Sequence, residues 1–195
     1  MDERDREARY CFGCGGLNPQ GLHLTFRWDG ERAIADFTPQ HEHQGYPGYT
    51  HGGLVATLLD EAMGWCIAFR GAWAVTGKMN VRFREPVPLL KPVVVSAFVE
   101  RDRRRWLLVK AEVRSREGEV LAEADALFMR VSGERREELA EIYFRRSTAE
   151  DYKSAGAPPD SISGGRRNRM CYTSHDGRRT KGGSAGRGQR VLFSG

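Results

Sequence analysis

Hydrophobic and polar positions alternate in several separate runs of this chain, and these runs predict β-strands. Residues 22–28 (LHLTFRW) and 32–37 (RAIADF) alternate on either side of Asp29-Gly30, which is typical of a β-hairpin. Three longer strand-like runs, joined by short polar turns, cover residues 93–101, 106–116 and 120–131. Runs that follow one another so closely predict an antiparallel meander.

A further strand is predicted over residues 76–84 (TGKMNVRFR). Its alternation puts Met79, Val81 and Phe83 on one face. The residues of the other face are Thr76, Lys78, Asn80, Arg82 and Arg84. Three prolines follow soon after this run and end the strand, because proline cannot donate to a sheet ladder.

Between the hairpin and this strand, residues 45–66 (GYPGYTHGGLVATLLDEAMGWC) predict a Gly/Pro loop that leads directly into a long helix. The helix is expected to begin near Gly52, with Thr50 or His51 accepting from its first free amides. From Leu54 onward apolar positions run almost all the way round, as in a helix that other elements surround. The element order predicts an α+β domain in which a curved antiparallel sheet wraps one long central helix.

One face of this helix carries small residues and a single carboxylate. Steps of three or four residues place Gly53, Ala56, Thr57, Asp60 and Gly64 on it. The two glycines after His51 leave amide donors free at the positive helix N-terminus and let a substrate carbonyl approach. Asp60 lies roughly 12 Å further along the axis than Gly52. Both groups reach one small reacting centre only if a second chain or a bent loop supplies half of the site, which predicts a dimer.

Composition adds a location and a domain plan. The chain has 195 residues, of which 39% are hydrophobic and 29% charged, typical of a soluble protein. No apolar run of about eighteen residues predicts a membrane span, and the charged start MDERDREARY does not resemble a secretory signal, so a cytoplasmic location is expected. Four parts are predicted: an N-terminal segment with a CFGC motif (1–21), the sheet-and-helix domain (22–133), a short amphipathic helix (134–146) and a disordered basic tail (147–195).

The net charge of +5 comes from the tail. Residues 145–195 hold eleven Lys/Arg and four Asp/Glu, a net charge of +7, which leaves −2 for the rest of the chain. No aromatic platform interleaves the arginines of the tail, so it is interpreted as a solvated spacer and no nucleic-acid partner is predicted.

The CFGC motif is half of a zinc motif. Cys11 and Cys14 have the right spacing, but no second cysteine pair follows, and His23, His41 or His43 would have to complete a closed site. The preferred interpretation is a reduced pair that packs or lines the substrate site, with no metal bound.

The helix and the motif together resemble a known family. HGGLVATLLDEAMG, preceded by a Pro-Gly loop and by CFGCGGLNPQGL, resembles the hotdog-fold acyl-CoA thioesterases of the phenylacetate-pathway and mammalian thioesterase-superfamily-member branch. The resemblance covers roughly residues 11–131. It implies a hotdog fold, a homodimer or a dimer of dimers, an acyl-CoA substrate, and no cofactor, since coenzyme A is part of the substrate.

The resemblance also implies roles for individual residues. Asp60 is the catalytic carboxylate, as nucleophile or as the base that orients water, and the Gly52 amide, with Gly53, polarises the thioester carbonyl. Thr76 is expected near the partner subunit's Asp60, and His51 shapes the loop and contacts substrate. The remaining predicted substrate ligands are Gly45, Lys78, Asn80 and Arg82.

Three alternatives stay open at this stage. Gly45 stands where several relatives carry Asn or Gln, with Gln44 and His43 as possible replacements, so a non-catalytic acyl-CoA binding or sensing module is the competing function. Lys78, Arg82 and Arg84 suit coenzyme A phosphates but equally a solvated strand face. Glu61 is expected to face away from the small residues and to pair with an arginine on a neighbouring strand.

Overall fold

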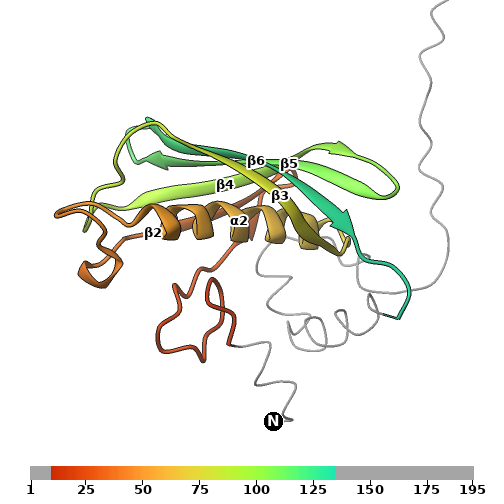
Figure 1. Cartoon of the computed structure of the whole chain (residues 1–195), viewed down its shortest axis with the longest axis horizontal. Coiled ribbons are helices and arrows are strands. Elements are labelled where there is room, and N and C mark those ends of the chain that lie inside the picture. The colour runs from red at the N-terminus through yellow and green to blue at the C-terminus, as the bar shows by residue number, and fades with distance from the viewer. Residues whose placement is uncertain (1–9, 135–195) are drawn as a thin grey trace, which may run out of the picture. The chain divides into compact units, whose positions relative to one another are not determined.

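In the computed structural model, which describes residues 10–134, six strands form one antiparallel sheet that packs on a long helix (Figure 1). The elements are β1 (Arg27–Trp28), β2 (Arg32–Phe37), the 3-10 helix η1 (His41–His43), α2 (Gly52–Phe69), β3 (Ala74–Phe83), β4 (Val93–Asp102), β5 (Trp106–Ser115) and β6 (Val120–Arg130). The predicted α+β order of strands, one helix and more strands is confirmed.

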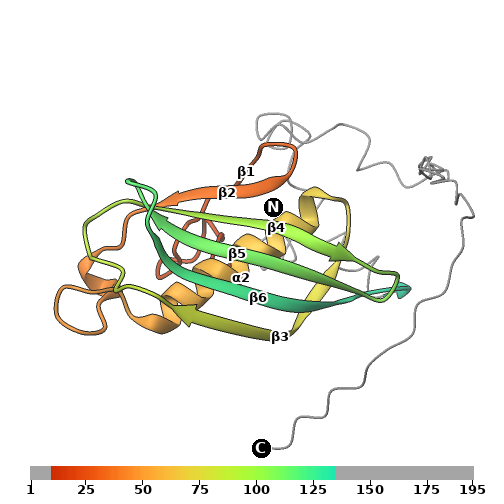
Figure 2. The same ribbon diagram turned by 90° about the horizontal axis from the view of Figure 1, so that it is seen from above.

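The strand order in the sheet is β1-β2-β4-β5-β6-β3, with every neighbouring pair antiparallel. Seen from above, α2 runs beneath the strands (Figure 2). In β5 the side chains of Leu107, Val109, Ala111 and Val113 are buried, whereas the residues between them are only half-buried. This alternation matches a sheet that buries one face against the helix.

The predicted strand over residues 22–28 is mostly irregular, because only Arg27–Trp28 pair in the sheet. Leu22, Leu24 and Phe26 are nevertheless buried and their intervening neighbours are not. The amides of Leu22 and Leu24 donate instead to the carbonyl oxygens of Phe12 and Gly13, at 2.8 and 2.9 Å. The predicted alternation of buried and exposed side chains is therefore confirmed. The backbone of residues 22–24, however, pairs with the CFGC loop (residues 11–21) and not with another strand.

Helix α2 is buried along one broad side and open along another. Its buried residues are Val55, Leu58, Leu59, Ala62, Met63, Cys66, Ile67 and Phe69. Ala56, Thr57, Asp60 and Gly64 stay partly exposed, and a Cβ added to Gly64 would meet nothing within 4 Å. Within residues 10–134 the helix is therefore not surrounded on every side, and the face of small residues is the one left open.

Edge strand β3 carries a bulge that the sequence pattern did not show. Its pairing with β6 shifts register between Thr76 and Lys78, so one extra residue sits in β3 there. The prediction that Thr76 shares a face with Lys78 is wrong: Thr76 turns toward α2, on the same side as Met79 and Val81, which pack against the core. A one-residue shift reverses the face of every side chain beyond it.

Helix α2 is long and apolar enough (18 residues, mean hydropathy 1.3) to span a membrane. The sequence pattern predicts no such segment. This is weak evidence for a membrane span, because a helix buried in the core of a domain has the same length and composition. The predicted amphipathic helix and basic tail lie, apart from Glu134, outside the described residues.

Candidate active site

Asp60 lies on the open face of α2, half-buried, and is oriented from the edge strand. The Thr76 hydroxyl donates a hydrogen bond of 2.7 Å to Asp60 Oδ1. The bulge in β3 makes this contact possible, because it turns the hydroxyl toward the helix. The resemblance placed Thr76 beside the partner subunit's Asp60; the structure brings it instead to the carboxylate of its own chain.

At the N-terminus of α2 one backbone amide is hydrogen-bonded to the capping residue and another is free among residues 10–134. His51 is the N-cap, and its Nδ1 accepts from the Gly53 amide at 2.9 Å, which confirms one of the two predicted caps. The other candidate, Thr50, has a buried hydroxyl without a partner among the described residues. The Gly52 amide has no acceptor within residues 10–134, and Gly52 is exposed. Gly52 is therefore the donor available to an incoming carbonyl, while Gly53 is occupied.

The loop before the helix explains why position 45 is glycine. A Cβ at Gly45 would lie 2.9 Å from the Cα of His51, too close for any side chain without moving backbone. The neighbouring Gln44 side chain accepts from the Gly48 amide at 3.0 Å, and His43 Nδ1 accepts from the Gln40 amide at 2.9 Å. Gln44 and His43, the two candidate replacements for the Asn or Gln that relatives carry at position 45, thus both accept hydrogen bonds from backbone amides of this loop.

The three predicted ligands on β3 lie on the outer face of the sheet, opposite to α2. Asn80 donates to Asp125 Oδ2 at 2.9 Å, and Arg82 lies 3.7 Å from Glu123. Lys78 is exposed and has no ion pair among residues 10–134. The structure does not bring these side chains to Asp60, and their contact with substrate stays a prediction.

Glu61 has partners that the sequence did not predict. It makes no ion pair with an arginine within the described residues; Trp65 Nε1 donates to its Oε1 at 3.2 Å, and Cys11 Sγ lies 3.7 Å from each of its oxygens. Burial raises the pKa of Glu61 to about 7. The expected ion pair is wrong because the CFGC loop, and not a strand, covers this side of the helix.

The two cysteines of the CFGC loop shift each other's pKa in opposite directions. A hydrogen bond from the Cys14 thiol lowers the pKa of Cys11 to about 5, and the same contact raises the pKa of Cys14. The ligand atoms of Cys11, Cys14 and Glu61 all lie within 4.8 Å of one another. None of the histidines expected to complete a zinc site belongs to this cluster, and His23 Nδ1 instead contacts the Gly15 carbonyl oxygen at 3.1 Å.

Part of the chain, including the residues of the candidate site, is similar to known thioesterases. Residues 47–122 match the thioesterase superfamily, and this stretch includes His51, Gly52, Asp60 and Thr76. Over this stretch the chain is similar to the thioesterase superfamily. Its thioesterase domain is 34% identical over 106 residues to mouse acyl-coenzyme A thioesterase THEM4, a match that covers 54% of this chain and 46% of the mouse protein. The chain spans less than half the length of the THEM4 relatives that it matches.

Solved structures confirm the hotdog fold of the thioesterase domain. The thioesterase superfamily protein RHA08564 superposes with a TM-score of 0.62 at 23% identity, over 66% of this chain and 68% of that one. A hypothetical thioesterase protein from Streptococcus pneumoniae TIGR4, solved with coenzyme A, gives a TM-score of 0.53 at 15% identity, over 56% of this chain and 86% of that one. The CFGC loop precedes the family match and is not part of it.

Proposed function

We propose that the chain hydrolyses acyl-CoA thioesters to a free carboxylic acid and coenzyme A, with Asp60 as the catalytic carboxylate. The observation that carries this proposal is the 2.7 Å hydrogen bond from Thr76, which fixes Asp60 on the open face of α2. The THEM4 relatives, which are named acyl-coenzyme A thioesterases, support the substrate class. So does the coenzyme A in the Streptococcus pneumoniae structure.

Thr76 and Asp60 work as a pair in this mechanism. The hydroxyl occupies Oδ1, which leaves Oδ2 to take a proton from water or to attack the thioester carbon itself. In either route a C–O bond forms at the carbonyl carbon, the C–S bond breaks, and the coenzyme A thiolate leaves and takes up a proton. When Asp60 attacks, the product of this step is a mixed anhydride, and water then cleaves it to release the carboxylic acid and regenerate the carboxylate. Two solved mutants of the Streptococcus pneumoniae protein replace an aspartate and a threonine by alanine sixteen residues apart, the separation of Asp60 and Thr76.

The Gly52 amide stabilises the negative charge that develops on the carbonyl oxygen. It is the free amide at the positive end of α2, and His51 keeps its neighbour Gly53 engaged. A donor fixed before the reaction needs no reorganisation as the charge develops, which is why such groups accelerate acyl transfer.

A second copy of the chain completes the site. Gly52 and Asp60 of one helix are roughly 12 Å apart along its axis, too far to hold one carbonyl group. Among residues 10–134, strand β3 is an edge of the sheet and pairs only with β6, and it exposes Val75 (54%) and Phe83 (56%). An exposed, apolar edge strand is a surface for pairing with another strand. A homodimer formed along β3 brings the Gly52 of one protomer toward the Asp60 of the other.

Of the outer-face residues, Lys78 is the one available to a coenzyme A phosphate. Asn80 and Arg82 already face carboxylates on β6, whereas Lys78 has no ion pair within residues 10–134. A lysine ammonium is a suitable point charge for phosphate.

The test is release of free thiol from acyl-CoAs with short, medium, long and aryl-acetyl groups, comparing wild type with Asp60→Asn. Turnover is expected to fall by roughly 100-fold or more in the variant. Asp125→Asn is the matched control, because Asp125 also accepts from a β3 side chain, on the opposite face of the sheet. Saturable acyl-CoA binding without turnover in wild type would replace the proposal by the non-catalytic binding module, and equal turnover in Asp60→Asn would exclude Asp60 as catalyst.

A further inference from the structure

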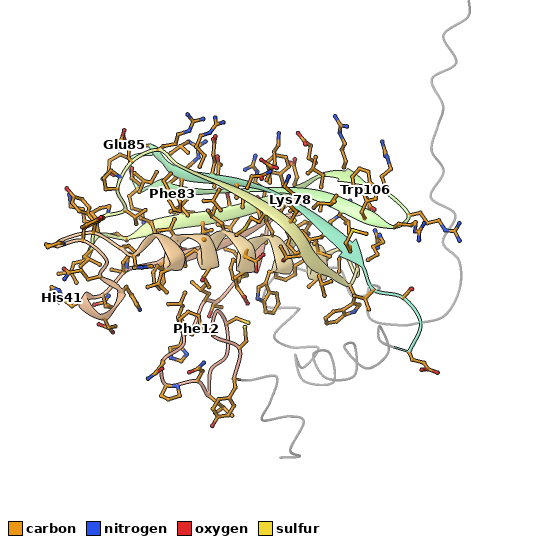
Figure 3. The ribbon with its side chains drawn as sticks, viewed as in Figure 1. Phe12, His41, Lys78, Phe83, Glu85 and Trp106 are labelled. Atoms are coloured by element: carbon orange, nitrogen blue, oxygen red, sulfur yellow. The ribbon has the colours of Figure 1, made fainter. Side chains whose placement is uncertain are left out.

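The CFGC loop lies on the side of α2 away from the sheet, where Figure 3 labels Phe12 beneath the helix. We infer that Cys11, Cys14 and Glu61 form a binding site for a divalent metal ion, with Zn²⁺ as the preferred ion. The three side chains supply two sulfur ligands and one oxygen ligand within 4.8 Å of one another. This site is separate from the proposed catalytic site at Asp60, although its carboxylate ligand, Glu61, directly follows Asp60 in the helix.

The distances fit a tetrahedral centre. Zinc binds cysteine sulfur at about 2.3 Å and carboxylate oxygen at about 2.0–2.2 Å, so tetrahedral angles put the sulfur and oxygen ligands about 3.6 Å apart. Cys11 Sγ lies 3.7 Å from Oε1 and 3.7 Å from Oε2 of Glu61. Cys11 and Glu61 therefore stand at the required separation before any metal enters, and the Cys14 sulfur lies within 4.8 Å of both.

The loop is built to hold this arrangement. The Gly15 amide donates to the Cys11 carbonyl oxygen at 2.9 Å, which closes the turn that carries both cysteines. A Cβ at Gly13 would lie 2.5 Å from the Glu61 carboxyl carbon, so only glycine lets the loop approach the carboxylate this closely. The CFGC spacing and the glycine inside it thus both allow the cysteines to lie close to the Glu61 carboxylate.

A second layer of contacts fixes the carboxylate. Trp65 Nε1 donates to Glu61 Oε1 at 3.2 Å, and the Trp65 ring stacks on Phe26 with centroids 6.0 Å apart. Hydrogen bonds from such neighbours orient metal ligands and raise their affinity. Oε2 is left without a nitrogen donor in the described part of the chain and is free to face a metal.

Charge balance favours a cation at this place. Glu61 and the two thiols are half-buried, and within residues 10–134 no lysine or arginine pairs with them. A carboxylate buried without a positive partner is costly, and a divalent ion removes that cost. Thiolate ligands select zinc over magnesium or calcium, which prefer oxygen. Three protein ligands leave a fourth position for water.

The metal would join the CFGC loop to the middle of α2. In wild type we expect one Zn²⁺ per chain after the purified, reduced full chain is stripped with a chelator and titrated with zinc against a chromophoric competitor. Co²⁺ in place of zinc is expected to give thiolate-to-cobalt charge-transfer bands and the intense visible absorption of tetrahedral cobalt. Both measurements read the site directly and do not depend on thioesterase activity.

Three variants assign the ligands. Cys11→Ser, Cys14→Ser and Glu61→Gln are each expected to weaken zinc binding by roughly 100-fold or more, since loss of a second-layer partner alone costs about 10- to 100-fold. Glu61→Gln keeps the shape of the side chain and the oxygen that Trp65 contacts, so it tests the charge with the fold preserved. Cys171→Ser, which removes a thiol outside the described residues, is the matched control and should bind zinc as wild type does.

Two results would overturn the inference. One is the absence of stoichiometric zinc or cobalt binding by the reduced wild-type chain at micromolar metal. The other is zinc affinity unchanged in both cysteine variants, which would place any bound metal elsewhere. A Cys11–Cys14 disulfide in the protein as isolated, with no metal bound after reduction, would assign the pair to redox chemistry instead.

Discussion

Thr76 Oγ1 donates to Asp60 Oδ1 at 2.7 Å, from a bulged edge strand to the open face of the central helix. The relationship joins the two elements that the proposed mechanism needs. Because the hydroxyl engages one carboxylate oxygen, the proposed mechanism assigns the reaction to the other.

Thr76→Val is expected to lower thioesterase turnover by roughly 10- to 100-fold, since a hydrogen bond to a charged group contributes about 1.5–3 kcal/mol. Thr76→Ser keeps the hydroxyl and should retain most of the activity. Turnover is measured by thiol release, with circular dichroism as the check on folding. Full activity in Thr76→Val together with a loss in Thr76→Ser would show that the methyl group, and not the hydroxyl, is what matters.

His51→Ala removes the cap of α2 and leaves the Gly53 amide without its acceptor. The free energy of unfolding should fall by about 1 kcal/mol, as for other N-cap losses. Urea denaturation of wild type, His51→Ala and His51→Asn measures it, and Asn, a good N-cap residue, should recover most of the difference. Equal stability of wild type and His51→Ala would argue that the cap contributes nothing.

Gly45→Ala places a methyl group 2.9 Å from the His51 Cα and forces backbone at the start of α2 to move. We expect a loss of about 1–3 kcal/mol in the free energy of unfolding, in the range of overpacking. Gly64→Ala is the contrasting variant, because its new Cβ meets nothing within 4 Å and alanine favours a helix by about 1 kcal/mol. Denaturant unfolding of both proteins should give opposite signs; the same sign in both would contradict the steric argument.

Glu112 predicts an acid-dependent loss of stability. A hydrogen bond from Arg114 at 2.8 Å, together with Arg32 at 3.4 Å, holds the pKa of its carboxyl below the usual value. Its contribution is therefore complete above about pH 4.3, the pKa of an unfolded glutamate, and is lost as pH falls through the lower folded pKa.

Glu112→Gln should accordingly be less stable than wild type at pH 7, with a difference that shrinks toward pH 3. Urea unfolding at several pH values measures this. Glu31→Gln is the control, because Glu31 makes no ion pair among residues 10–134. A difference between wild type and Glu112→Gln that does not vary with pH would contradict the assignment.

The sequence indicated the chemistry of the helix well, because that information is local. The start of α2 at Gly52, the His51 cap and the small face that carries Asp60 all follow from spacing along a single element. The partner of Asp60 was harder to assign. Strict alternation puts Thr76 on the face away from the core, whereas the bulge between Thr76 and Lys78 turns it toward α2, and an alternating pattern cannot show a bulge.

What the sequence by itself determined is the α+β order, the hotdog resemblance and the loop-helix motif, since periodicity and turn residues act over short distances. Only the tertiary structure decided which surfaces meet. The Cys11 and Cys14 thiols lie beside Glu61, fifty residues away from Cys11, and no histidine of residues 10–134 joins this cluster. Asn80 and Arg82 face outward to β6. Contacts between segments far apart in the chain depend on how the sheet and the loop enclose the helix, and no local pattern records that.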